Sequence, residues 1–348
     1  MLKELTPLAS HSNGVDCRHL SVFNLLNYKQ YSHFESVWKQ CGLFYTKPTD
    51  DAPGLLRSKY LNIEEEMHLV HNIDAFSLKT IDSQGFINDC LKSIKHNDPI
   101  IVYVDTYYLK GNFYFQKKHM LHTVILADVE DDIFTLVDDT FYQIYQLEKT
   151  DFLKTANIKR DDKYVYNYLT FSLKNAKDIL ETKDFLKVIN QNKIYLSGDL
   201  KEEQLQKLSN LHRDYPVKIT GMNAITQFVK DYKYFETEQE ISQEIYYSLY
   251  LSLMELANYH YRYFSFLKFC KLKDPDIDEL LDLLEDMSQE WRVSSNMMLK
   301  AMYKNDLNLF KRMLRKVENI KMNLQLTLER SAIILCKYKY QGDFQYVD

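Results

Sequence analysis

Cys17 is the residue of this chain best placed to act as a thiol nucleophile. It follows the turn-like stretch 11–16 and opens a helical pattern over residues 17–28, for which Asp16 is a suitable N-cap. A thiol attacks as its thiolate, and the unpaired N–H groups at a helix N-terminus lower the pKa of a thiol. The sequence therefore predicts an activated Cys17, with a small buried thiol as the alternative.

A general base and an acid follow on two predicted strands. His122 opens the β-branched run 122–128, and the run 133–138 ends in the pair Asp138 and Asp139. The VEDD segment between the runs has the composition of a tight hairpin turn. An antiparallel hairpin places the start of its first strand beside the end of its second, so one carboxylate would orient the imidazole. This order of cysteine, histidine and acid is that of papain-like enzymes, and a surface histidine is the alternative.

Further candidates concern the oxyanion and the substrate. His11 lies six residues before Cys17, where papain-like enzymes place a glutamine that donates to the oxyanion. Asn13 is close by, and either side chain could donate, as could the backbone N–H of Cys17. His119 lies in the loop just before His122 and is a candidate for substrate binding, with a solvated position as the alternative.

The wider pattern indicates an α+β protein. The chain has 348 residues, enough for more than one domain, and only 8 Gly and 6 Pro, which favours long helices. A helix at about 82–95 and strands at 99–105 and 163–172 are predicted in the first half, and helical periodicity dominates the second. We expect a catalytic domain over 1–170, with a helix packed on an antiparallel sheet, and a helical domain over 171–348.

The second half contains three long helical segments. One covers 238–269, another begins at Asp274-Pro275 with the aspartate as cap, and the last spans about 305–336. Aromatic residues recur from 232 to 269. Their plainest role is packing between helices, and the alternative is an apolar wall for an acyl chain.

Charge and cysteine usage exclude several classes of protein. The net charge is −5 without a Lys/Arg block, which argues against a nucleic-acid partner. No apolar run approaches the roughly 20 residues of a membrane span, and no signal peptide precedes the helix, so we expect a cytoplasmic protein. The five cysteines are odd in number, widely spaced and without a CxxC pair, which argues against disulfides and against a metal site.

Several segments resemble the butirosin biosynthesis protein H-like family. The stretch GVDCRHLSVFNLLNY resembles the family's nucleophile helix, and 34–47 resembles its next segment. The most specific match is 104–141, with an Asp-x-Tyr-Tyr-Leu segment, a basic-His-x-x-His step and an aspartate after the following strand. The helical domain that follows in the family is similar to three further segments of this chain, 221–232, 261–269 and 290–302.

The resemblance implies a papain-like fold and assigns roles residue by residue. Cys17 would be the nucleophile and His122 the base. Spacing from the histidine favours Asp138 as the acid, whereas the Asp-Thr-Phe ending fits the family through Asp139; we slightly prefer Asp138. Strand alternation allows only one of the two to face the imidazole. Two further matches to the family would support the pocket or be structural, namely Asp105 and Tyr107.

The resemblance also implies a function. The family suggests an acyltransferase of specialised-metabolite, or antibiotic, biosynthesis that forms an amide without ATP, a metal or a bound cofactor. Its partners would be an acyl carrier protein, which delivers the acyl group on phosphopantetheine, and a small amine. The family is distantly similar to peptidases that trim bacteriocin leader peptides, so a peptidase or thioesterase is one alternative. A non-catalytic binding protein is another, and a homodimer through the helical half is possible.

Overall fold

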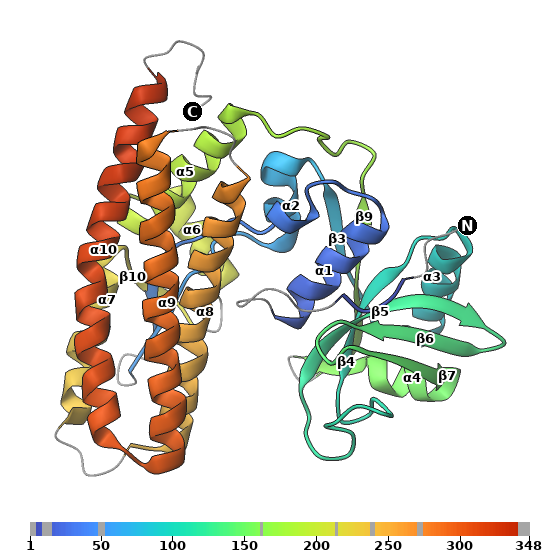
Figure 1. Ribbon diagram of the computed structural model, residues 1–348. Helices are drawn as coiled ribbons and strands as arrows, with labels where there is room; N and C mark the ends of the chain where they lie inside the picture. The colour runs from blue at the N-terminus through green and yellow to red at the C-terminus, as the bar shows by residue number, and fades with distance from the viewer. Residues whose placement is uncertain are drawn as a thin grey trace. The chain divides into compact units, whose positions relative to one another are not determined.

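In the computed structural model of the protein, the chain folds into two compact units (Figure 1). The first unit comprises Met1–Val37 and Ile63–Asp178, and the second comprises Trp38–Asn62 and Ile179–Asp348. The structure describes residues 5–8, 16–47, 53–160, 163–212, 215–236, 241–269 and 274–339. The fold is α+β, with antiparallel sheets and a helical C-terminal part.

A seven-stranded antiparallel sheet is the framework of the first unit. Its order is β3-β9-β4-β5-β6-β7, with β8 paired to β9. The strands are β3 (Asp74–Thr80), β4 (Ile100–Asp105), β5 (Leu121–Glu130), β6 (Ile133–Asp138), β7 (Gln143–Glu148), β8 (Asn157–Arg160) and β9 (Lys163–Ser172). The helices are α1 (Cys17–Tyr28), α2 (Ile63–His71), α3 (Ser83–Lys95) and α4 (Lys149–Ala156), with the short 3-10 helix η1 (Phe34–Ser36).

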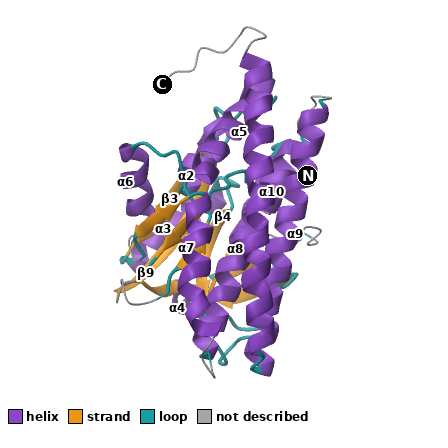
Figure 2. Cartoon of the chain, turned by 90° about the vertical axis from the view of Figure 1, so that its left-hand side faces the viewer, coloured by secondary structure: helices purple, strands orange, loops and turns teal. Residues whose placement is uncertain are grey.

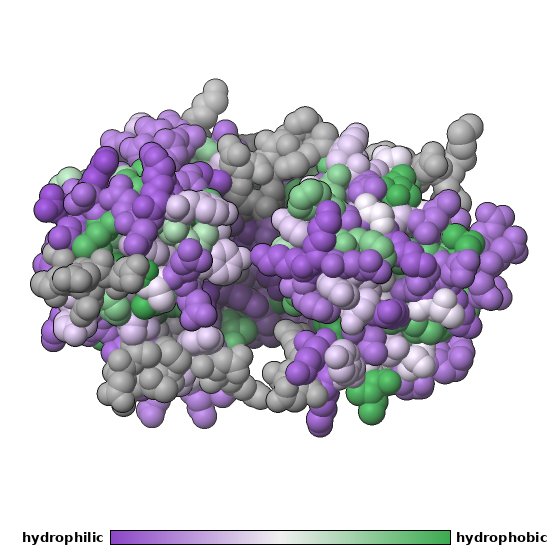
Figure 3. Space-filling view, turned by 90° about the horizontal axis from the view of Figure 1, so that it is seen from below, coloured by the Kyte–Doolittle hydropathy of each residue, from purple (hydrophilic) through white to green (hydrophobic). Residues whose placement is uncertain are grey.

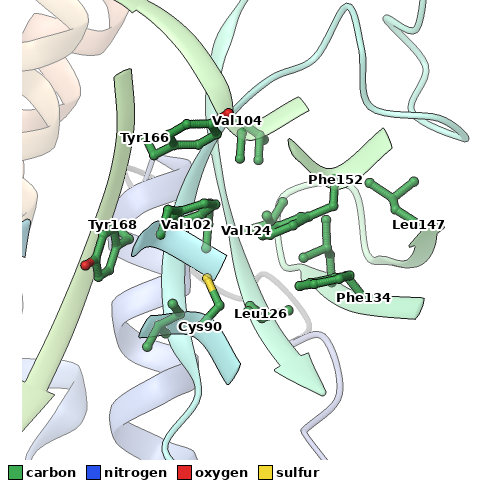
Figure 4. Close-up of a cluster of buried hydrophobic side chains, with 14 of the residues drawn as sticks. Cys90, Val102, Val104, Val124, Leu126, Phe134, Leu147, Phe152, Tyr166 and Tyr168 are labelled. Carbon is green, nitrogen blue, oxygen red and sulfur yellow. The ribbon is translucent and has the colours of Figure 1, made fainter. Parts of the chain in front are cut away.

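An apolar cluster joins the sheet to α3 and α4 (Figure 4). Phe86 of α3 and Phe152 of α4 stack at 5.6 Å between ring centroids and pack with Val124 of β5. Burying an aromatic side chain of this size contributes about 2 kcal/mol or more. Helix α1 packs on β4 and β5, with Ser21 Oγ 3.4 Å from Thr123 Oγ1. These contacts fix α1 against β4 and β5.

The second unit combines a small sheet with long helices. Its strands are β1 (Phe44–Thr46), β2 (Leu55–Arg57) and β10 (Val217–Thr220), in the order β10-β1-β2. Its helices are α5 (Thr182–Ser197), α6 (Glu202–Leu211), α7 (Met222–Lys233), α8 (Gln243–Lys268), α9 (Pro275–Lys304) and α10 (Leu307–Lys339), with the short η2 (Tyr234–Glu236). Helix α9 packs against both α8 and α10, and the three run side by side (Figure 2).

A buried asparagine fastens the early segment 38–62 to the second unit. Asn192 of α5 accepts hydrogen bonds from Cys41 N and Tyr60 Oη, and its amide donates to Lys39 O at 2.9 Å. The side chain is fully buried, so each missing bond would leave a desolvated polar group. The bonds therefore help to hold 38–62 within this unit.

Most predicted elements are confirmed, and the domain division differs. Helix α1 begins at Cys17 with Asp16 as N-cap, and α9 begins at Pro275 with Asp274 as N-cap. The sequence assigned all of 1–170 to the first domain, whereas 38–62 belongs to the second unit. Strands β1 and β2 have three residues each, too few for a hydrophobic period to identify them.

Polar and apolar residues are interspersed on the face shown in Figure 3. Apolar residues on that face lie among polar side chains, as is ordinary for exposed surface. This face does not test a homodimer through the helical half, which stays one option raised by the sequence. Across the described residues, no helix has both the length and the apolar character of a membrane span.

Candidate active site

Cys17 is the first residue of α1. The Asp16 carboxylate accepts a hydrogen bond from His19 N at 3.1 Å, which closes the first turn of the helix. Burial raises the pKa of Cys17, and the negative charge of Asp16 acts in the same direction. The hydrogen bond and the charge of His122, with a hydrogen bond to Thr123, outweigh both, so the pKa of the thiol is lowered.

His122 is the buried partner of this thiol. It is the second residue of β5, is 4% exposed, and places Nε2 2.9 Å from Asp138 Oδ2. Burial lowers the pKa of His122, but its hydrogen bonds and charge interactions with Asp138 and Cys17 raise that pKa to about 9. Since Nε2 is engaged by the carboxylate, Nδ1 is the ring nitrogen that remains for the thiol.

Asp138 orients the imidazole of His122, and each oxygen of its carboxylate accepts two hydrogen bonds. It ends β6, is fully buried, and accepts four hydrogen bonds, from His122 Nε2, Tyr145 Oη, Thr140 N and Phe141 N. Four donors around two oxygens require the ionised acceptor form. The neutral imidazole therefore carries its proton on Nε2, and its Nδ1 lone pair is ready to take the proton of Cys17.

The lowered pKa of Cys17 and the raised pKa of His122 together favour a thiolate–imidazolium pair. By contrast, burial raises the pKa of Cys41 and of Cys90, which keeps both as inert thiols. The arrangement is therefore suited to nucleophilic attack by Cys17.

We expect this pair to be lost as the pH rises through about 9, because His122 then gives up its proton. The pKa of His122 is raised on folding from 6.5, so its contribution to stability is complete below pH 6.5 and lost towards pH 9. NMR spectra of histidine-labelled protein, with the His122→Gln variant for assignment, would measure the titration. A midpoint near 6.5 would contradict the paired arrangement.

Asp139 faces away from the imidazole. Its Oδ1 accepts hydrogen bonds from Leu8 N and Asn24 Nδ2, both at 2.8 Å, while Oδ2 is buried without a hydrogen-bond partner among the described residues. Asn24 also donates to Thr6 O at 2.9 Å. Asp139 therefore ties α1 and the segment 5–8 to the end of β6. The acid that contacts His122 is therefore Asp138, and not the alternative candidate, Asp139.

Asp139 should make the stability depend on pH. Burial, reinforced by the charge of Asp138, raises the pKa of Asp139 from 3.8 to about 7, so the folded protein binds this proton more tightly than the unfolded chain. Stability therefore falls as the pH rises from about 4 through 7. We expect Asp139→Asn to gain about 2 kcal/mol relative to wild type between pH 5 and pH 8. Urea unfolding at both pH values tests this, and a constant difference would contradict it.

Of the other residues predicted to belong to the site, three lie together near the surface and two lie outside the described part of the chain. The Asp105 carboxylate accepts hydrogen bonds from Tyr107 N at 3.0 Å and His119 Nδ1 at 2.7 Å, and the His119 ring stacks on Tyr107. In the sheet Val104 pairs with His122, so Asp105 points to the opposite face. These three residues therefore form a cluster separate from the His122–Asp138 pair. His11 and Asn13 lie outside the described residues.

One residue at the site was missed by sequence reasoning. Tyr145 of β7 is 2% exposed and places Oη 3.1 Å from Asp138 Oδ2. Predicting it requires β7, where Tyr145 and Leu147 alternate with exposed residues. That alternation was the available signal.

The described residues contain no group of three or more His, Cys, Asp or Glu side chains placed to hold a metal ion. A comparison with models of known protein families found no match, and a comparison with curated proteins found none either. The chemistry of Cys17, His122 and Asp138 is therefore the basis for a proposed function.

Proposed function

We propose that this protein is a papain-like, cysteine-dependent acyltransferase. It would move an acyl group from an acyl carrier protein thioester through acyl-Cys17 to a small amine, forming an amide in specialised-metabolite biosynthesis. The observation that carries the proposal is the buried His122, whose Nε2 lies 2.9 Å from Asp138 Oδ2 and whose interaction with Cys17 lowers the pKa of that thiol. The resemblance to the butirosin biosynthesis protein H-like family supplies the choice of donor and acceptor.

In the first half-reaction the Cys17 thiolate attacks the carbonyl carbon of the thioester. The N–H groups of the first turn of a helix lack intrahelical acceptors, so the backbone N–H of Cys17 is a candidate donor to the oxyanion. When the tetrahedral intermediate collapses, the carbon–sulfur bond to the carrier breaks and His122 gives its proton to the departing thiolate. One thioester replaces another, so this step needs no ATP.

In the second half-reaction an amine attacks acyl-Cys17. Neutral His122 takes the amine proton on Nδ1, the new carbon–nitrogen bond forms, and Cys17 leaves as thiolate. The Asp138 carboxylate stabilises the imidazolium at each proton transfer. Water competes with the amine at this step, so a transferase must exclude it.

The decisive experiment separates transfer from hydrolysis. The full chain is incubated with an acyl carrier protein bearing an acyl-phosphopantetheine thioester, with and without a panel of small amines. Intact-mass spectrometry should show one acyl group on Cys17, and chromatography with mass detection should show the amide. Free acid as the sole product, in the presence of every amine, would identify a thioesterase. Neither acyl-Cys17 nor product would overturn the proposal and favour a binding protein.

A further inference from the structure

A second hydrogen-bond chain ends on the Asp138 carboxylate. Asn112 Nδ2 lies 3.0 Å from Tyr145 Oη, and Tyr145 Oη lies 3.1 Å from Asp138 Oδ2. All three residues are buried, the asparagine at 5% exposed. The chain reaches the triad from the connection between β4 and β5, where Asn112 lies.

The direction of each bond in this chain is fixed. Asn112 Oδ1 accepts from Tyr114 N at 2.9 Å, and a backbone N–H can only donate, so the amide nitrogen of Asn112 must face Tyr145. Tyr145 Oη accepts from that nitrogen, and its own proton therefore goes to Asp138 Oδ2. His122 Nε2 donates to the same oxygen. Two donors thus share one carboxylate oxygen.

We propose that Tyr145 is a positioning residue that acts on His122 through Asp138, holding Oδ2 in place and limiting how tightly His122 keeps its proton. The inference rests on the proposed function, because it assigns His122 the role of acid and base. A carboxylate oxygen that also accepts a hydrogen bond from a tyrosine hydroxyl attracts the imidazolium less strongly. Asn112 strengthens this effect by orienting the hydroxyl.

The chemistry gives this restraint a use. His122 must release a proton to the leaving thiolate and then accept one from the amine within each turnover. A base works best when its pKa lies near the working pH. Asp138 and Cys17 already raise the pKa of His122 to about 9, and an unshared Asp138 would raise it further. The Tyr145 hydroxyl opposes that rise.

Tyr168 provides a matched control within the same apolar cluster (Figure 4). Like Tyr145 it is almost fully buried, and its hydroxyl donates to a carboxylate, that of Asp89, at 2.5 Å. Asp89 lies on α3 and is not bonded to the triad. Tyr168→Phe therefore removes a tyrosine hydroxyl from a residue of the same cluster without touching Asp138.

The test is the titration of the His122 ring by NMR in full-length wild type, Tyr145→Phe and Tyr168→Phe. Apart from Tyr145 itself, the groups that titrate around Asp138, namely His122, Cys17 and Asp139, are common to all three proteins. We expect Tyr145→Phe to raise the midpoint by about one pH unit, a tenfold change in proton affinity. Tyr168→Phe should leave it unchanged.

An unchanged or lowered midpoint in Tyr145→Phe, or an equal rise in both variants, would overturn the inference. Thermal unfolding checks that each variant folds. If Tyr145→Phe does not fold, Asn112→Ala decides in its place. It keeps the tyrosine and should raise the midpoint in the same direction by less, and no rise would again overturn the inference. The titration needs no turnover, so its failure is distinct from failure of the acyltransferase assay.

Discussion

Replacing Cys17 by alanine should abolish acyl transfer, while replacing Cys336 by alanine should leave it unchanged. The expected loss is on the order of 10⁴-fold or more, because the covalent route disappears with its nucleophile. Cys336 lies exposed on α10 and serves as the matched control. The measurement is the rate of amide formation, with intact-mass detection of the acyl-enzyme.

Alkylation gives the same prediction an independent readout. At pH 7 iodoacetamide should modify Cys17 well before Cys336, because the pKa of Cys17 is lowered by its histidine partner. Peptide mapping by mass spectrometry identifies the modified residue. Full activity in Cys17→Ala, or equal alkylation of the two cysteines, would argue for a non-catalytic protein.

Replacing Asp138 by asparagine should lower the rate by on the order of 10³-fold or more, whereas Asp139→Asn should change it less than about threefold. Asparagine can present an oxygen either to the two backbone N–H groups or to His122 and Tyr145, but not to both. With its amide nitrogen towards His122, the imidazole moves its proton from Nε2 to Nδ1. Nδ1 can then no longer accept the proton of Cys17.

Asp139 is a stringent control for Asp138, because the two aspartates are adjacent in the chain and both are buried. Asp139 bonds to Leu8 and Asn24 and does not contact His122. Steady-state rates with a thioester substrate, combined with thermal unfolding of each variant, separate loss of chemistry from loss of fold. The reverse order of effects would transfer the acid role to Asp139.

The candidate site could be assembled from the sequence because its parts are local. Asp16 and Cys17 mark the start of a helix. Asp131 and Asp132, both with positive φ, form the turn of the β5–β6 hairpin. The hairpin brings the end of β6 to His122. Alternation alone does not choose between Asp138 and Asp139, because it says that they face opposite sides without saying which side holds His122; only the spacing from His122 favours Asp138. The hydrogen bond between His122 and Asp138 shows the side.

The features that escaped prediction depend on distant partners. Tyr145 contacts Asp138 only because β7 pairs with β6, and Asn112 joins it from a connection without a regular period. Strands β1 and β2 are paired with β10, which is far along the chain. Short strands of this kind gain their conformation from the sheet they join, so their own residues carry little signal.

The placement of 38–62 has a consequence for how the chain is made. Cys41 bonds to Asn192, 151 residues further on, so at ordinary rates of translation its partner emerges on the order of ten seconds later. During that interval β1 and β2 have left the ribosome with their sheet and helix partners still unmade. Apolar side chains of this segment that are buried in the folded protein, such as Phe44 and Leu56, are then still without their packing partners. Neither unit corresponds to a contiguous gene fragment, so simple truncation at residue 171 or 179 would separate a hairpin from the fold that it completes.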